Sequence, residues 1–127
     1  MPYSLHIVKT NDFIRLDPTG EFNLTESRRA LSGLARQCVE SGINCALLDV
    51  RDMEKESLTM AEVYTLAMAF REMGFGKNHR LAVLHRYRSG ERSEFFAITA
   101  QDHGWNVQAF EDYKEALDWF ATEWQVK

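Results

Sequence analysis

The chain has 127 residues, of which 45% are hydrophobic and 27% are charged, a balance typical of one soluble globular domain. Its formal net charge of −4 gives no long-range attraction for nucleic acid or for an anionic membrane surface. The N-terminus "MPYSLHIVKTND" has no signal-peptide pattern, and no apolar run approaches the ~20 residues that a membrane helix needs. We therefore expect one domain over residues 1–127, cytoplasmic, with no nucleic-acid partner and no membrane insertion.

The first half of the chain predicts two short strands, a helix and a longer strand. Polar and apolar residues alternate over residues 3–10 and again in "FIRL", which indicates a β-hairpin turning at "ND". Asn23 or Thr25 can cap a helix with one apolar face, and Gly42 can end it. The next segment, "CALLDV" at residues 45–50, is apolar on both faces, as in a central strand covered by helices on both sides.

Helix signals and strand signals continue to alternate in the second half. Thr59 and Glu62 fit a T-x-x-E capping box, which opens a helix that runs to a stop at Gly74. "RLAVLH" at residues 80–85 predicts the next strand. Ser89 or Ser93 can begin a third helix, whose apolar residues are Phe95, Phe96 and Ile98 and which ends at Gly104.

"NVQAF" at residues 106–110 predicts a short last strand, and a capping box from Asp112 to Glu115 opens the final helix. The predicted order is β-β-α-β-α-β-α-β-α. Alternating strands and helices imply an α/β fold with a mixed, mostly parallel sheet, an N-terminal hairpin and helices on its faces.

The carboxyl ends of parallel strands usually border the ligand crevice, so we expect function in the loops 49–58, 85–92 and 110–112. Asp49 ends a predicted central strand there, and an Asp in that place can be a phosphoacceptor, a general base, a metal ligand or a turn residue. A phosphoacceptor of the receiver type needs a partner acidic pair, a hydroxyl and a lysine. The corresponding places hold "ND", His85 and "FED", which argues against that role.

The loop after residue 84 is basic. It carries His85, Arg86, Arg88 and Arg92 beside one acid, Glu91. These side chains could bind a phosphate or carboxylate together with free N–H groups at the start of the third helix, or they could pair with the acidic loop 49–58. We predict Asp49, His85, Arg86, Arg88 and Arg92 as candidate ligand-binding or anion-binding residues.

Sequence motifs for enzymes and cofactors are missing. The chain has no G-x-S-x-G, no Walker loop and no G-x-G-x-x-G, and its cysteines have no zinc spacing. Cys38 and Cys45 lie in a predicted helix and a predicted core strand, where a thiol usually acts as a small buried hydrophobe. We expect no catalytic residue, no cofactor and no metal.

The segments "IRLDPTGEFNLTE", "CALLDVRDM", "ESLTMAEVYTLAMAF" and "RLAVLH", in this order, resemble STAS domains, the fold of anti-sigma-factor antagonists. The ending "RSEFFAITAQDHGWNVQAFEDYKEALDWFA" is similar to that of the SpoIIAA-like branch, which is related to CRAL-TRIO domains. The resemblance implies a bacterial regulatory or ligand-sensing module. In that family a Ser or Thr after the central strand is phosphorylated, and Ser57 and Thr59 stand at that place in the context "KESLTM".

Three functions remain open. The first is a non-enzymatic module that binds a protein partner or itself, as a homodimer; Trp105, Trp119 and Trp124 could supply aromatic surface for it. The second is a carrier or sensor of a small apolar molecule or lipid, in a crevice lined by Tyr64, Met68, Tyr87 and Phe95. The third is an enzyme, for instance a hydrolase that uses Asp49 and His85.

Overall fold

The computed structural model describes residues 7–9, 12–18, 20–56, 58–86 and 90–122. Its main sheet has five strands in the order β1-β2-β4-β6-β7. β1 pairs with β2 in antiparallel fashion, and the remaining neighbours are parallel, so the predicted mixed, mostly parallel sheet with an N-terminal hairpin is confirmed. The strands are β1 (Ile7–Lys9), β2 (Ile14–Leu16), β4 (Cys45–Asp49), β6 (Arg80–Leu84) and β7 (Asn106–Phe110).

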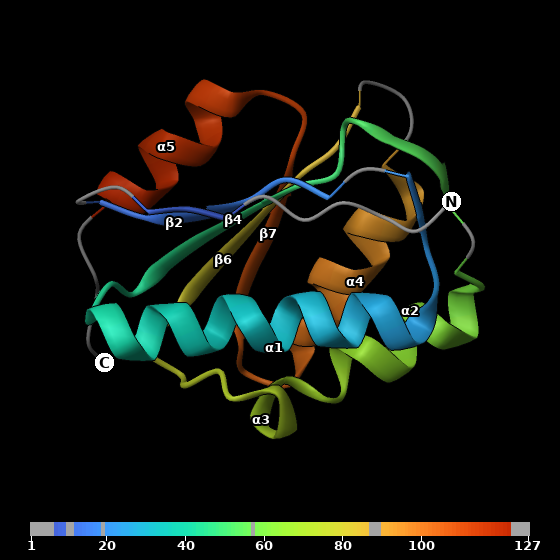
Figure 1. The fold of residues 1–127 in the computed structure, drawn as a ribbon, viewed down its shortest axis with the longest axis horizontal. Helices are drawn as coiled ribbons and strands as arrows, with labels where there is room; N and C mark the ends of the chain where they lie inside the picture. The colour runs from blue at the N-terminus through green and yellow to red at the C-terminus, as the bar shows by residue number, and fades with distance from the viewer. Residues whose placement is uncertain (1–6, 10–11, 19, 57, 87–89, 123–127) are drawn as a thin grey trace.

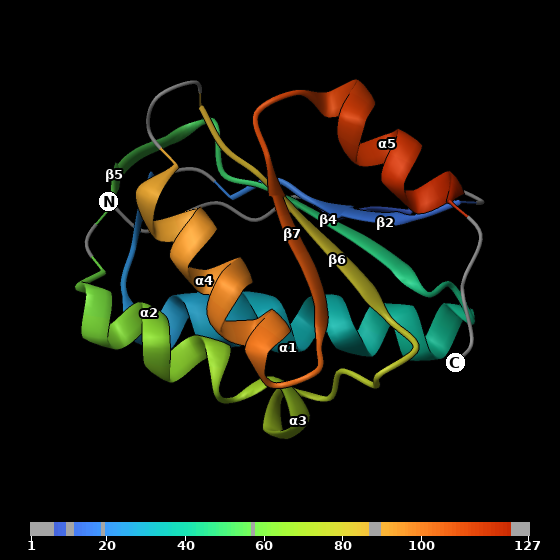
Figure 2. The same cartoon turned by 180° about the vertical axis from the view of Figure 1, so that it is seen from behind.

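Helices cover both faces of this sheet, as Figures 1 and 2 show. The helices α1 (Leu24–Ser41), α2 (Met60–Ala67), α3 (Phe70–Met73) and α4 (Glu91–Asp102) pack on one face, and α5 (Tyr113–Ala121) packs on the other. Alternating strand residues serve the two cores: Ala46 and Leu48 lie in the α1–α4 core, whereas Leu47 lies in the α5 core. This explains why "CALLDV" has no polar alternation.

The two most apolar strands, β4 and β6, are adjacent, parallel and internal to the sheet, as predicted. Their register pairs Cys45 with Arg80 and Asp49 with Leu84. The two strands therefore end at the same level, and the loops that follow them start side by side.

Local signals at the ends of α1 identify its boundaries. The side chain of Asn23, rather than Thr25, caps the helix by accepting a hydrogen bond from the N–H of Glu26 at 2.8 Å. Gly42 has φ 69° in the left-handed region, which a glycine adopts without steric cost, and it ends the helix. Cys38 on this helix is buried, and burial raises the pKa of its thiol to about 11; Cys45 is half-buried, and both cysteines are free.

The prediction of one continuous helix from Thr59 to Gly74 was wrong in its middle. The chain leaves the α-helix after Ala67 and resumes as α3 at Phe70. The N–H of Ala69 bonds to the carbonyl of Leu66, an i to i−3 bond that tightens the turn. Phe70 then sits at the centre of an aromatic cluster with Phe75, Phe96 and Trp105, so tertiary packing overrides the helical periodicity.

The start of α4 also differs from the prediction. Its N-cap is Gly90, which makes no side-chain cap bond, and Ser93 is buried inside the first turn. Ser89 lies outside the described residues. Of the apolar residues named for this helix, Phe96 is buried, whereas Ile98 is 56% exposed.

A second, two-stranded sheet was not predicted. β3 (Gly20–Phe22) pairs in parallel with β5 (Met53–Glu56), at the edge of the molecule beyond α2 and α4. The sequence of β5 is "MEKE", which has neither β-branched residues nor an apolar run. The residues of β5 therefore carry no strand signal of their own.

Trp105 and Trp119 do not form the exposed aromatic surface that we predicted for self-association. Trp105 is half-buried and stacks on Phe70 with ring centroids 5.6 Å apart, and Trp119 is half-buried against Phe110 and Phe120. Trp124 lies outside the described residues. The exposed large apolar residues in the described part of the chain are Val39, Met60, Tyr64, Met68 and Ile98, and three of them are on α2 or at its end.

Candidate functional site

The predicted site residues meet at the carboxyl edge of the sheet, because β4 and β6 end side by side. Asp49 ends β4, His85 and Arg86 follow β6, Arg92 lies in the first turn of α4, and Thr59 precedes α2. Ser57 and Arg88 lie outside the described residues. The question is which of these side chains remain available for chemistry or for a ligand.

The carboxylate of Asp49 is buried and bound by two arginines. Arg15 of β2 donates to Oδ2 at 2.7 Å. Arg51 donates to both oxygens, from Nε at 2.9 Å and from a terminal nitrogen at 2.7 Å, and its backbone N–H bonds to Oδ1 at 3.1 Å. Arg15 also pairs with Asp17 at 2.7 Å, so two carboxylates and two guanidinium groups form one neutral network.

This network fixes the ionisation of Asp49. Burial alone would raise the pKa of its carboxyl group, but the hydrogen bonds and positive charge of Arg51, together with the charge of Arg15, outweigh burial and lower it. A carboxylate with a lowered pKa and saturated lone pairs is a poor general base. In this network the carboxylate of Asp49 links β2, β4 and the turn after β4, which agrees with the turn-residue interpretation among those that the sequence left open. Arg15 and Arg51 were missed as its partners; the signal was a basic residue inside the apolar strand "FIRL".

Asp49 and His85 point to opposite faces of the sheet. Asp49 pairs in register with Leu84, whose side chain lies in the α5 core, as does that of Leu47 two residues before Asp49. Side chains alternate along a strand, so His85 follows Leu84 onto the other face, where it meets α4. This arrangement does not favour a hydrolase site that pairs Asp49 with His85.

His85 is itself enclosed. The residue is 2% exposed, Nδ1 lies 2.9 Å from the carbonyl oxygen of Arg86, and Nε2 lies 3.8 Å from a carboxylate oxygen of Glu94. The ring packs directly against Gly90: a Cβ built on that glycine would lie 2.5 Å from Nδ1. The groove beside it is acidic, because its lining includes Glu94, Glu111, Asp112 and Glu115. An anion has little reason to bind there.

Arg86 and Arg92 hold the neighbouring loop by its backbone. Arg86 donates to the carbonyl oxygens of Arg51 at 2.5 Å and Met53 at 2.7 Å. Arg92 donates from Nε to the carbonyl oxygen of Leu58 at 2.6 Å. The basic loop thus pairs with the acidic loop, and in the described part of the chain this pairing uses main-chain oxygens of the acidic loop. Anion binding by Arg86, Arg88 and Arg92 stays a prediction.

Thr59 forms the predicted capping box of α2. Its Oγ1 accepts from the N–H of Glu62 at 3.1 Å, and the carboxylate of Glu62 accepts from the N–H of Thr59 at 2.9 Å. Thr59 is exposed, and the solvent face of the helix that it starts is uncharged. That face consists of Met60, Ala61, Tyr64, Thr65 and Met68.

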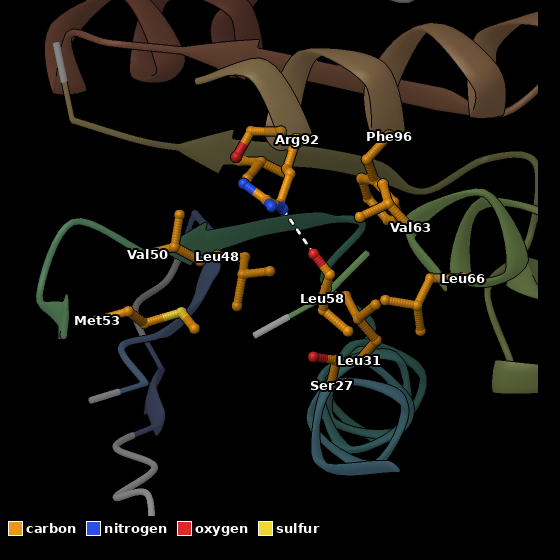
Figure 3. Close-up of a pocket in the computed structure, with 12 residues that line it drawn as sticks. Ser27, Leu31, Leu48, Val50, Met53, Leu58, Val63, Leu66, Arg92 and Phe96 are labelled. Carbon is orange, nitrogen blue, oxygen red and sulfur yellow. Dashed lines mark hydrogen bonds between the residues drawn. The ribbon is translucent and has the colours of Figure 1, made fainter. Parts of the chain in front are cut away.

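An apolar pocket lies inside the same edge, between α1, β4, α2 and α4 (Figure 3). Its volume is about 80 Å³. The predicted crevice residues Tyr64, Met68 and Phe95 are not in its wall, and Tyr87 lies outside the described residues. The lining is Ser27, Leu31, Leu48, Val50, Met53, Leu58, Val63, Leu66, Val83, Arg92, Ser93 and Phe96.

Two further properties bear on function. No helix in the described part of the chain is long and apolar enough to span a bilayer. Within the same residues, no three His, Cys, Asp or Glu side chains gather in a way that would hold a metal ion.

Comparison of the sequence with family models and with curated proteins finds no match. Solved structures do match. An anti-sigma factor antagonist from Mycobacterium paratuberculosis is 16% identical with TM-score 0.64, covering 95% of this chain and 96% of that one. An uncharacterized protein with a SpoIIAA-like fold from Shewanella loihica is 21% identical with TM-score 0.56, covering 93% of each chain.

A third match is the anti-sigma factor antagonist SpoIIAA in its unphosphorylated form, at 11% identity and TM-score 0.52, covering 94% of this chain and 98% of that one. All three matches run over nearly the whole of both chains, so the likeness is one of complete folds. The protein therefore has the STAS fold in its SpoIIAA-like form.

Proposed function

We propose that this protein is a non-enzymatic regulatory module that binds a protein partner through α2 and the Thr59 cap. The observation that carries the proposal is the solvent face of α2. Met60, Tyr64 and Met68 are 43%, 47% and 45% exposed, and no charged residue lies among them. An exposed apolar stripe on a soluble protein is typical of a protein-binding surface.

The burial and hydrogen bonding of the polar side chains at this edge also support a non-enzymatic role. A nucleophile or general base needs a reactive group within reach of a substrate. Asp49 is saturated by Arg15 and Arg51, and His85 is enclosed on the other face of the sheet. Two of the matched structures are named anti-sigma factor antagonists, and that name describes proteins that act on other proteins.

The second part of the proposal is a phosphorylation switch at Ser57 or Thr59. Thr59 is exposed at the N-terminus of α2, where free N–H groups and the helix dipole tolerate a phosphate. The same phosphate would put about two negative charges next to the uncharged stripe and so weaken docking. One of the matched structures is SpoIIAA in its unphosphorylated form, and the existence of a distinct unphosphorylated form in that protein supports a switch of this kind.

Capture from an extract of the native cells, followed by native mass spectrometry of the complexes, tests the proposal. We expect a partner that wild type retains and that the double variant Tyr64→Glu, Met68→Glu loses, since the charges interrupt the stripe. Gln108→Glu is the matched control, because Gln108 is exposed on β7, away from α2. Thr59→Asp and Ser57→Asp should fold and bind that partner more weakly. Identical captured proteins for wild type, the double variant and the control would contradict the docking surface.

The lipid-carrier function has less support. Ligand sites for drug-sized molecules have volumes of about 300–1,000 Å³. The apolar pocket at this edge measures about 80 Å³, too little for an acyl chain of a membrane lipid.

A further inference from the structure

The apolar pocket contains one polar atom whose surroundings are unusual. Ser27 on α1 is 5% exposed, and its Oγ is buried without a hydrogen-bond partner in the described part of the chain. Figure 3 shows Ser27 and Leu31 on the side of α1 that borders the pocket. The pocket and the unpaired hydroxyl are independent observations, and they coincide.

A helical serine usually has a simple way to satisfy its hydroxyl, by bonding to the carbonyl four residues earlier. Here the carbonyl of Asn23 accepts the backbone N–H of Ser27 at 2.9 Å, but Oγ makes no such bond. A buried polar group without a partner costs free energy unless something else binds it. Water is a poor candidate, because an ordered internal water needs two to four polar partners. Apart from Ser27, Arg92 and Ser93, every side chain in the lining is apolar.

Two other polar side chains line the pocket, Arg92 and the buried Ser93, and the guanidinium of Arg92 is already engaged. Arg92 donates to the carbonyl oxygen of Leu58, another residue of the pocket lining, at 2.6 Å, the bond drawn in Figure 3. An incoming charged group would have to leave water for apolar walls and compete with this bond. The pocket therefore favours a neutral molecule.

The volume sets the size of that molecule. One water-sized group occupies about 10–15 Å³ by this measure, so about 80 Å³ holds roughly five to eight non-hydrogen atoms. We propose that the pocket binds a small neutral molecule of this size, apolar except for one hydroxyl or carbonyl group that hydrogen-bonds to Ser27 Oγ. This inference goes beyond the proposed docking function and needs no protein partner.

Phenol and toluene make a matched pair of probes, since they have the same number of non-hydrogen atoms and only phenol carries a hydroxyl. Titration followed by amide chemical shifts in the full chain reports where each one binds. We expect saturable shifts at Ser27, Leu58 and Val63, with phenol binding more tightly than toluene. Ser27→Ala should weaken phenol binding roughly three- to tenfold, the worth of one hydrogen bond, and leave toluene binding unchanged.

Two further variants complete the test. Ser32→Ala on the same helix is the control and should bind phenol as wild type does, because Ser32 is not in the pocket wall. Ser27→Ile should fill the pocket and abolish binding of both probes. Equal phenol affinity for wild type and Ser27→Ala would overturn the proposal, as would shifts confined to residues outside the pocket or the absence of saturation with either probe.

Discussion

Asp49 shows how its bonding partners determine the function of a carboxylate. Placed at the end of a central strand, the same residue could serve catalysis in another protein with this kind of sheet. Here Arg15 comes from the neighbouring strand and Arg51 from the following loop, and together they use both carboxylate oxygens. The result is a link between β2, β4 and the loop after β4, rather than a reactive group.

Replacing Asp49 with Asn should destabilise the protein by about 2 kcal/mol at neutral pH, because two arginines lose charge-assisted hydrogen bonds. The loss should stay below the ~3–5 kcal/mol of a fully buried pair, since the side chains of Arg15 and Arg51 are 24% and 39% exposed. Urea unfolding measures it. The control Asp17→Asn, a more exposed partner of Arg15, should cost less than about 1 kcal/mol.

The difference in unfolding free energy between wild type and Asp49→Asn should depend on pH. The folded pKa of Asp49 lies below its ordinary value of 3.8, so its contribution is complete above that pH and is lost as pH falls through the folded pKa. The stability difference between wild type and Asp49→Asn should therefore narrow in acid. A difference that stays constant down to pH ~2 would mean that the network does not hold Asp49 ionised.

At the scale of elements, α2 combines a strong start with an unusual surface. Thr59 and Glu62 form both hydrogen bonds of the capping box, so the helix begins at the predicted position. The exposed residues of its solvent face are all uncharged, whereas Val63, Leu66 and Ala67 on the opposite face are buried in the core. Core packing thus holds one face of α2 in position, and the opposite face is accessible to a binding partner.

Removing the cap tests the first half of this description. Thr59→Ala should cost about 1 kcal/mol of unfolding free energy, because the N–H of Glu62 loses its acceptor. Ser57→Ala should cost less, and Thr59→Asp should be close to wild type because an aspartate also caps helices. Urea unfolding of the three variants gives these free energies. An unfolding free energy of Thr59→Ala equal to that of wild type would contradict a stabilising role for the cap.

The elements also show where sequence reasoning succeeds and where it cannot. Caps and glycine stops are local, so Asn23, Gly42 and Thr59 could be identified from a few neighbouring residues. The break between α2 and α3 depends on the burial of Phe70 against residues that are distant in sequence, and β5 depends on pairing with β3. For the site, the edge of the sheet was predictable from strand order, but the arginine partners of Asp49 and the pocket at Ser27 required the three-dimensional packing.

At the scale of the whole molecule, the fold has one heavily covered face and one lightly covered face. α1, α2, α3 and α4 share the first core, and α5 alone covers the second. The exposed large apolar residues lie on helices of the heavier side: Met60, Tyr64 and Met68 on α2 or at its end, Ile98 on α4 and Val39 on α1. The largest group of them is on α2. If two copies associate, this surface is where we expect them to meet.

We predict that the wild-type protein sediments as a dimer at high micromolar concentration. The double variant Tyr64→Glu, Met68→Glu should sediment as a monomer under the same conditions. The reason is that a two-fold interface brings the same patch of both copies together, so each substitution places like charges opposite one another. A wild-type monomer at that concentration would exclude the dimer. A dimer unaffected by the double variant would move the interface elsewhere.

The close approach of Gly90 to His85 has a consequence for how this sequence can diverge. Gly90 has φ −105° and ψ 10°, a conformation open to any amino acid, so the restriction there is steric, and the atoms nearest to an added Cβ all belong to the imidazole ring of His85. A larger side chain at position 90 therefore needs a smaller one at position 85, whereas a smaller residue at position 85 needs no change at position 90. Among orthologues of this protein, glycine at position 90 should persist wherever position 85 is histidine, and a larger residue at 90 should appear only together with a smaller one at 85.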